Sequence, residues 1–241
     1  MTYKSYKTYK NLFLQSTPLL DVRSESEFVQ GSFPLATNIP ILNDSERHQV
    51  GLCYAQKGST AALALGHQLV CGETKRQRVD TWKEFAQKNL TGALFCWRGG
   101  ERSRLAQEWL LEAGVNFPRI EGGFKALRRF LMETMEDIIS KTEWIVIAGP
   151  TGSGKTERIQ KMENAIDLEA CANHRGSAFG GNPSPQPSQI DFEHCLAIEL
   201  LKRHEKGITK IYAEDESRMV GKSALPISLY QKILTSPLIV I

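Results

Sequence analysis

The stretch LFCWRGGERS, residues 94–103, joins a short apolar run to a helical pattern through a loop that contains a cysteine. Cys96 follows the apolar run, which is typical of a buried strand, and the helical pattern begins at Ser103. The first amides of a helix lack partners within it, so they and two nearby arginines favour negative charge. The pattern predicts a nucleophilic Cys96 thiolate beneath an anion site formed by Arg98, Gly99, Gly100, Arg102 and Ser103. A buried structural cysteine is the alternative interpretation.

The composition fits a globular protein with room for two domains. The 241 residues are 41% hydrophobic and 24% charged, and a net charge of +3 does not by itself indicate a nucleic-acid-binding protein. No apolar run is long enough to cross a membrane, and the N-terminus lacks the apolar core of a signal peptide. Five widely spaced cysteines show no metal-binding pattern. We therefore expect a cytoplasmic protein with reduced thiols, no membrane partner and no bound structural metal.

The residues before the cysteine loop alternate between helical and strand patterns. We expect a helix over residues 3–14, strands over residues 18–22 and 36–39, and further helices over residues 60–70 and 79–87. Ser24 and Glu27 have the spacing of a capping box, which predicts a short helix that ends near Gly31. This alternation predicts an α/β domain.

Three separated segments resemble rhodanese-like domains. DVRSESEFVQGSFPLATNIP, residues 21–40, is similar to their opening signature, and EGGFKAL, residues 121–127, is similar to their closing turn and helix. Cys96 lies where rhodaneses carry their persulfide-forming cysteine. The loop is one residue longer than the usual rhodanese loop and is similar in spacing to that of cysteine phosphatases, which wraps a tetrahedral phosphate. The resemblance implies a rhodanese-like domain over residues 1–137, with a site for a larger anion than thiosulfate.

A second motif follows the apolar run WIVIA, residues 144–148. GPTGSGKT, residues 149–156, is a complete Walker A sequence between a predicted strand and a predicted helix. Backbone amides in such a loop cradle phosphates, Lys155 would neutralise terminal oxygens, and Thr156 would hold a Mg²⁺ ion. The phosphate site is predicted to consist of Gly149, Thr151, Gly152, Ser153, Gly154, Lys155 and Thr156.

Acidic residues follow the apolar run at residues 208–213. Glu214, Asp215 and Glu216 end this run, and carboxylates at the end of a strand lie beside the phosphate site of a doubly wound sheet. Of these, Glu214 or Asp215 is the first candidate for a base or for a residue that orders a metal-bound water. A helix start rich in carboxylates is the alternative. Residues 165–169 are a further short strand-like run. These motifs predict a P-loop NTPase-like parallel-sheet domain over residues 138–241. Its last apolar run, residues 237–241, would form a strand beside the P-loop strand without a following helix, which predicts an incomplete domain.

The combination resembles one family. CWRGGERS, DLEACANHRGSAFG and EDESRMVG occur in this order, in a rhodanese-like domain followed by a P-loop domain, as in bacterial tRNA 2-selenouridine synthases, whose sequences continue further. The resemblance implies a transferase that attaches geranyl from geranyl diphosphate to the sulfur of wobble 2-thiouridine in tRNA, then replaces the S-geranyl group with selenium from selenophosphate. It implies that Cys96 serves selenation and that the P-loop binds diphosphate, with Mg²⁺ as a candidate cofactor and a selenophosphate-producing enzyme as a candidate partner.

Two alternatives remain open at this point. One is a rhodanese-type sulfurtransferase fused to a nucleotide-hydrolysing kinase or ATPase. The other is an inactive tRNA-binding fragment. The sequence does not separate geranyl from another prenyl chain, or selenium from sulfur.

Overall fold

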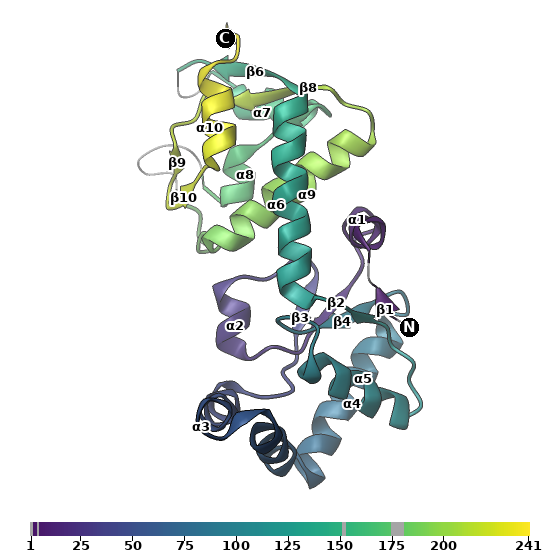
Figure 1. Cartoon of the computed structure of the whole chain (residues 1–241). Helices are drawn as coiled ribbons and strands as arrows, with labels where there is room; N and C mark the ends of the chain where they lie inside the picture. Colours follow the sequence, from purple (N-terminus) through teal and green to yellow (C-terminus); the bar gives the residue numbers. More distant parts are fainter. Residues whose placement is uncertain (1, 4, 151–152, 175–180) are drawn as a thin grey trace. The chain divides into compact units, whose positions relative to one another are not determined.

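The computed structural model describes residues 2–3, 5–150, 153–174 and 181–241. The chain divides into two compact units, Met1–Arg128 and Arg129–Ile241, and the division falls inside one long helix (Figure 1). Both units contain a parallel β-sheet with helices, so the predicted α/β class is confirmed. Among the described residues, no helix is both long enough and apolar enough to cross a membrane.

The first unit is built on a five-stranded sheet in the order β1-β5-β4-β2-β3, and every neighbouring pair is parallel. The strands are β1 Thr2–Tyr3, β2 Leu19–Asp21, β3 Ala36–Asn38, β4 Ala93–Phe95 and β5 Arg119–Ile120. The helices are α1 Tyr6–Leu14, α2 Glu25–Gln30, α3 Asp44–Leu69, α4 Gly72–Lys88, α5 Glu101–Glu112 and α6 Gly123–Lys141, which continues into the second unit.

Most elements predicted for the first unit are confirmed, but α3 and α4 begin earlier than predicted: α4 starts at Gly72 and not at residue 79, and residue 3, predicted as helical, lies in β1. α2 has the predicted capping box of Ser24 with Glu27, and Gly31 is its C-cap. α3 begins at Asp44, well before the predicted start at residue 60. Asn43 caps it, and Gly58 interrupts its helical geometry with φ of +82°. Because glycine tolerates this conformation, the sequence indicated a helix boundary where the structure has a kink.

The second unit is built on a four-stranded parallel sheet in the order β11-β6-β8-β7. The strands are β6 Glu143–Ala148, β7 Ala165–Ile166, β8 Lys210–Glu214 and β11 Leu238–Val240, and a separate antiparallel pair consists of β9 Met219–Val220 and β10 Ser223–Ala224. The helices are α7 Lys155–Lys161, α8 Leu168–Ala172, α9 Gln189–Glu205 and α10 Ile227–Leu234.

Two predictions for the second unit have different outcomes. The final apolar run pairs in parallel with β6 as predicted, and all three residues of β11 are exposed. The strand predicted over residues 165–169 is too long. β7 ends at Ile166, because the Asp167 carboxylate accepts a hydrogen bond from the Ala170 amide at 2.7 Å and so starts α8.

Candidate functional site

Cys96 lies at the carboxyl end of β4, directly before the loop that leads into α5. Its side chain is buried, and its Sγ lies 3.2 Å from the hydroxyl oxygen of Ser103 in the first turn of α5. Gly100 is the N-cap of α5 and supplies no side-chain cap, so the N–H groups of the first turn are not capped by a side chain. The sulfur therefore lies beside an electropositive helix end.

A close backbone contact fixes the shape of the Cys96 loop. The Phe124 amide donates a hydrogen bond to the carbonyl oxygen of Cys96 at 2.9 Å. Gly99 and Gly123 have φ of +64° and +55°, and a Cβ on Gly123 would lie 2.1 Å from that carbonyl oxygen. A Cβ on Gly99 would lie 2.5 Å from the Gly122 amide nitrogen. Only glycine fits at these two positions, which explains a glycine in the loop at residue 99 and one in the turn at residue 123.

The two arginines of the loop differ in their partners. Arg102 makes two hydrogen bonds to the carboxylate of Glu27, at 2.5 and 3.0 Å, and both side chains are largely buried. Burial opposes ionisation of Glu27, but the hydrogen bonds and charge of Arg102 outweigh it and lower the pKa of Glu27. Arg98 is exposed and has no ion-pair partner within the part of the chain that the structure describes. The guanidinium of Arg98 is thus available to an incoming anion, whereas that of Arg102 is already paired with Glu27.

A polar hollow of about 490 Å³ opens beside this ion pair. Trp97 of the Cys96 loop forms part of its wall, together with Ser24, Ser26, Glu27, Gln30, Asp44, Arg47, His48 and Arg102. Sequence reasoning placed Glu27 only in the capping box of α2. The structure shows that capping-box bond, from the Ser24 amide at 3.1 Å, and shows that the same carboxylate also accepts from Arg102, so one residue links the α2 start to the loop.

The Walker A sequence connects β6 to α7. Thr151 and Gly152 lie outside the described residues, whereas Gly149, Ser153, Gly154, Lys155 and Thr156 are described. The Lys155 ammonium group donates to the carbonyl oxygens of Gly149 and Pro150, at 2.5 and 3.1 Å. These bonds hold the positive charge of Lys155 at the Walker A loop, whose sequence is typical of phosphate-binding loops.

Three glutamates gather beside Thr156. The Thr156 hydroxyl lies 3.2 Å from Glu214 Oε1 and 3.5 Å from Glu169 Oε2. Carboxylate oxygens of Glu169, Glu214 and Glu216 lie within 4.8 Å of one another. Glu214 is only 1% exposed, and its Oε2 has no hydrogen-bond partner among the described atoms. An oxygen buried in this way usually has a ligand or water as its partner.

All three glutamates of this cluster have a raised pKa. Burial and then the negative charge of Glu169 raise the pKa of Glu214 to about 8. Burial, Glu169 and Asp215 raise the pKa of Glu216 to about 7, and burial followed by Asp167 raises that of Glu169. Three carboxylates without a cation favour protonation because ionisation would place like charges together.

The cluster differs from the acidic pair that the sequence indicated. Glu214 is part of it, whereas Asp215 is exposed and its carboxylate lies outside the group defined by the described residues. Period-two alternation after β8 places Glu216 on the side of Glu214, so the better candidate in the acidic run was Glu216 and not Asp215. Glu169 comes from α8, and only the fold brings it to Thr156. Oxygen ligands of this kind fit Mg²⁺, and the unpartnered Glu214 oxygen agrees with that fit.

One family model and one solved structure match parts of the chain. A family model described as the tRNA 2-selenouridine synthase AAA domain matches residues 142–241. A solved N-terminal domain of a Clostridium difficile 630 protein, described as ATP/GTP binding, is 29% identical over 55% of this chain and 99% of its own. Its TM-score of 0.46 is too low to support an argument about the fold.

Three curated relatives are named tRNA 2-selenouridine synthase. The Marinobacter nauticus protein is 50% identical over 97% of this chain, the Pseudomonas fluorescens protein 47% over 96%, and the Ectopseudomonas mendocina protein 49% over 96%. The chain covers 64%, 64% and 62% of their lengths. Along nearly its whole length, this chain is therefore a homologue of the tRNA 2-selenouridine synthases, and it spans somewhat less than two thirds of those relatives.

Proposed function

We propose that this chain carries out tRNA selenation, in which 2-thiouridine at the wobble position becomes 2-selenouridine through an S-geranyl intermediate. The observation that carries the proposal is the presence, on one homologous chain, of a buried cysteine at a helix start and a Walker A loop beside a carboxylate cluster. The substrates would be tRNA, geranyl diphosphate and selenophosphate, and the enzyme would be a transferase. A selenophosphate-producing enzyme would be a natural partner.

The first unit would be a rhodanese-like domain that serves the selenium step. Its parallel sheet and the position of Cys96 after β4 support this assignment. The seven-residue loop from Cys96 to Arg102 would wrap a tetrahedral anion the size of selenophosphate, with Arg98 and the α5 amides as donors. Cys96 would act there as the nucleophilic thiolate.

The second unit would serve the geranyl step. The thiocarbonyl sulfur of the nucleoside would attack the allylic carbon of geranyl diphosphate, the carbon–oxygen bond would break, and diphosphate would leave with the electron pair. Lys155 would exchange its bonds to Gly149 and Pro150 for bonds to the departing diphosphate. Because negative charge grows on that group in the transition state, this contact would stabilise the transition state more than the bound substrate.

Thr156, Glu169, Glu214 and Glu216 would hold a divalent cation such as Mg²⁺. When bound, such an ion would supply positive charge beside the phosphate oxygens. Because their pKa values are raised, Glu214 and Glu216 keep protons near neutral pH, and cation binding would have to displace these protons.

A nucleotide-hydrolysing kinase or ATPase fused to a sulfurtransferase is the second candidate. The specific observation in its favour is Glu214, a buried glutamate at the carboxyl end of β8 that contacts the Walker A threonine. The same arrangement would hold a metal–nucleotide complex.

Nucleoside analysis of tRNA separates these candidates. We would express the chain in a strain that lacks its own synthase and measure modified uridines by mass spectrometry. Selenouridine or geranylated thiouridine supports the proposal. Unmodified thiouridine, together with nucleotide hydrolysis that depends on Lys155, supports the kinase or ATPase. If neither modification nor hydrolysis is detected, the result supports a fragment that only binds tRNA.

A further inference from the structure

The first unit contains a second, apolar cavity of about 250 Å³ that the proposed chemistry does not use. It lies between α3 and α5 and is lined mostly by aliphatic and aromatic side chains. These residues are Ile41, Leu42, Val50, Tyr54, Ser59, Ala62, Leu63, Gly66, His67, Val70, Glu101, Arg102, Leu105 and Trp109.

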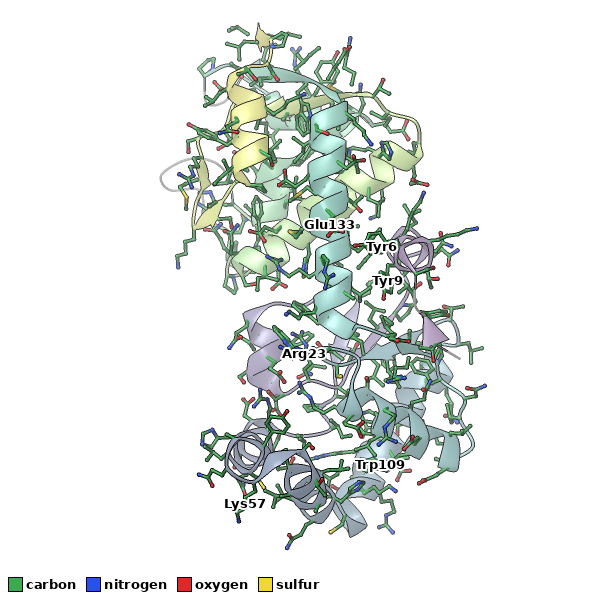
Figure 2. The ribbon with its side chains drawn as sticks, in the orientation of Figure 1. Tyr6, Tyr9, Arg23, Lys57, Trp109 and Glu133 are labelled. Atoms are coloured by element: carbon green, nitrogen blue, oxygen red, sulfur yellow. The ribbon has the colours of Figure 1, made fainter. Side chains whose placement is uncertain are left out.

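The kink in α3 accounts for the shape of the cavity. Lys57, labelled in Figure 2, immediately precedes the interruption at Gly58. Before the kink, Val50 and Tyr54 line the cavity at a spacing of four, which is one face of a helix. After the kink, Ala62 and Gly66 line it at the same spacing. Both halves of α3 therefore turn one face toward the same space.

α3 itself is poorly packed for its length. It spans 26 residues, of which only Ala62 is buried. Leu52, Tyr54 and Leu63 are 48%, 61% and 37% exposed. Most helices in proteins are held by a packed apolar face, so a long helix with one buried residue lacks its usual stabilisation. A ligand in the cavity would supply contacts that the chain does not.

One end of the cavity adjoins the Cys96 loop. Among its lining residues, Glu101 and Arg102 belong to the first turn of α5, and the wall that they contribute is almost wholly apolar. Arg102 also lines the polar hollow that Trp97 borders, where its guanidinium binds Glu27. Trp109, which Figure 2 labels, lies two turns further along α5. An apolar space and a polar space thus meet at Arg102, in the helix that follows the Cys96 loop.

We propose that this cavity binds a flexible hydrocarbon chain of about ten carbons whose polar end lies at Arg102. A cavity of about 150 Å³ holds the six carbons of benzene, which gives ~25 Å³ per carbon and roughly ten carbons for this cavity. The identity of the chain as the allylic group on the nucleoside sulfur rests on the proposed function. On that basis, the S-alkylated nucleoside would be held in the first unit, with its sulfur directed toward the Cys96 loop.

A chain-length series tests the size of the site. S-alkylated 2-thiouridine nucleosides with five-, ten- and fifteen-carbon prenyl groups would be titrated calorimetrically into the full 241-residue chain, with 2-thiouridine as the control. Each buried methylene contributes roughly fourfold in affinity. We expect the ten-carbon probe to bind at least ~10-fold more tightly than the five-carbon probe, and the fifteen-carbon probe to gain nothing further. Equal affinity for the five- and ten-carbon probes would contradict the proposal.

Two matched pairs of variants test the location. Leu63→Asp places a charge in the cavity wall, whereas Leu52→Asp changes an exposed leucine of the same helix that does not line the cavity. Ala62→Phe fills the cavity, whereas Ala64→Phe adds the same ring on the exposed face. We expect each cavity variant to bind the ten-carbon probe at least ~10-fold more weakly than the unaltered chain does, and each control to bind it with an affinity within ~2-fold. Circular dichroism would confirm that all four fold.

The outcomes distinguish this inference from the proposed function. Unchanged binding of the ten-carbon probe by the folded cavity variants would overturn the inference, even if the chain makes selenouridine in tRNA. Binding that is lost in the cavity variants and kept in the controls supports the inference, even if no selenouridine forms.

Discussion

The Cys96 loop and the P-loop are built alike but differ in how their charges are balanced. Each connects the carboxyl end of a parallel strand to a helix start. Beside the Cys96 loop, Glu27 is paired with Arg102 and its pKa is lowered. Beside the P-loop, three glutamates lie together, the pKa of Glu214 rises to about 8, and Lys155 bonds to backbone carbonyls.

This difference indicates what each site needs from outside. The protein's own side chains balance the charge at the first site, so an anion can bind there through Arg98 and the α5 amides without a metal. At the second site, three neighbouring carboxylates have raised pKa values and so retain protons, and a cation that arrives with the phosphate ligand would have to displace them. The predictions below test this contrast, from the largest expected effect to the smallest.

The largest effect is expected for Cys96→Ser. The hydroxyl lacks a thiolate's nucleophilicity, so selenium transfer should fall to background. The measurement is the selenium content of tRNA after incubation with selenophosphate. Cys53→Ser and Cys71→Ser change cysteines on α3 and at the α4 N-cap and serve as controls that should retain full activity. Equal losses in these controls would show that Cys96 has no special role.

Lys155→Ala should slow geranyl transfer by a smaller but large factor. A charge-assisted contact contributes about 1.5–3 kcal/mol, which corresponds to roughly 10- to 100-fold in rate. Single-turnover transfer of geranyl to thiolated tRNA measures it, with exposed Lys161→Ala in α7 as a control. If nucleotide hydrolysis depends on Lys155 and geranyl transfer does not, the second unit is a kinase or ATPase.

Cation binding at the glutamate cluster should tighten with pH. Below about pH 8 the folded protein keeps a proton on Glu214, so Mg²⁺ must displace it. We expect the affinity for Mg²⁺ to rise roughly 10-fold or more from pH 6.5 to 8.5, with proton release detected by calorimetry in two buffers.

The stability of the cation-free chain should also depend on pH. The folded chain keeps a proton on Glu214 up to about pH 8, whereas the unfolded chain loses it near pH 4.5. The free energy of unfolding should therefore fall as the pH rises from about 4.5 to 8, which urea denaturation would measure.

Glu214→Gln is the matching variant for this site. It replaces the Glu214 carboxyl group with an amide, which has no proton to release and no negative charge. Both the affinity for Mg²⁺ and the number of protons released on binding should therefore decrease. Glu157→Gln changes an exposed carboxylate on α7 outside the cluster and should leave both nearly unchanged. If Mg²⁺ binds Glu214→Gln as tightly as the unaltered chain, the cluster is not the cation site.

The smallest effect is expected for Glu27→Gln at the Cys96 loop. Removing one partner of a largely buried ion pair leaves Arg102 without its carboxylate, and we expect a loss of ~1–3 kcal/mol in the free energy of unfolding at pH 7. The pKa of Glu27 is lowered on folding, so its stabilisation is present above pH 4.5 and is lost as pH falls through the folded value. Urea denaturation measures both. Glu84→Gln, which changes an exposed carboxylate on α4, should have almost no effect.

Sequence patterns predicted the longer strands and the strand-to-helix loops because their signals are local. Apolar runs before Cys96 and before Gly149 marked β4 and β6, and a capping box marked α2. The two-residue strands β1, β5, β9 and β10 are too short to give such a signal and were not predicted. The first half of α3 escaped prediction because Gly58 resembles a helix boundary and the helix has only one buried residue to give it periodicity.

The site was predictable only where its residues are consecutive. Cys96 with its loop, and the Walker A residues, are contiguous motifs. Glu169 joins Glu214 through the fold, and Glu27 reaches Arg102 from another helix, so neither contact has a sequence spacing that would reveal it. The apolar cavity depends on a kink between two halves of one helix, which periodicity alone does not describe.

Nucleoside mass spectrometry of tRNA treated with the Cys96→Ser chain tests the central claim, two sites with separate tasks, most directly. Thiolated tRNA, geranyl diphosphate, Mg²⁺ and selenophosphate would be supplied together. The account predicts that S-geranyl-2-thiouridine accumulates and that 2-selenouridine is missing, because the P-loop site remains intact while the selenium site does not function. Loss of both nucleosides in a folded variant, or normal formation of 2-selenouridine, would contradict it.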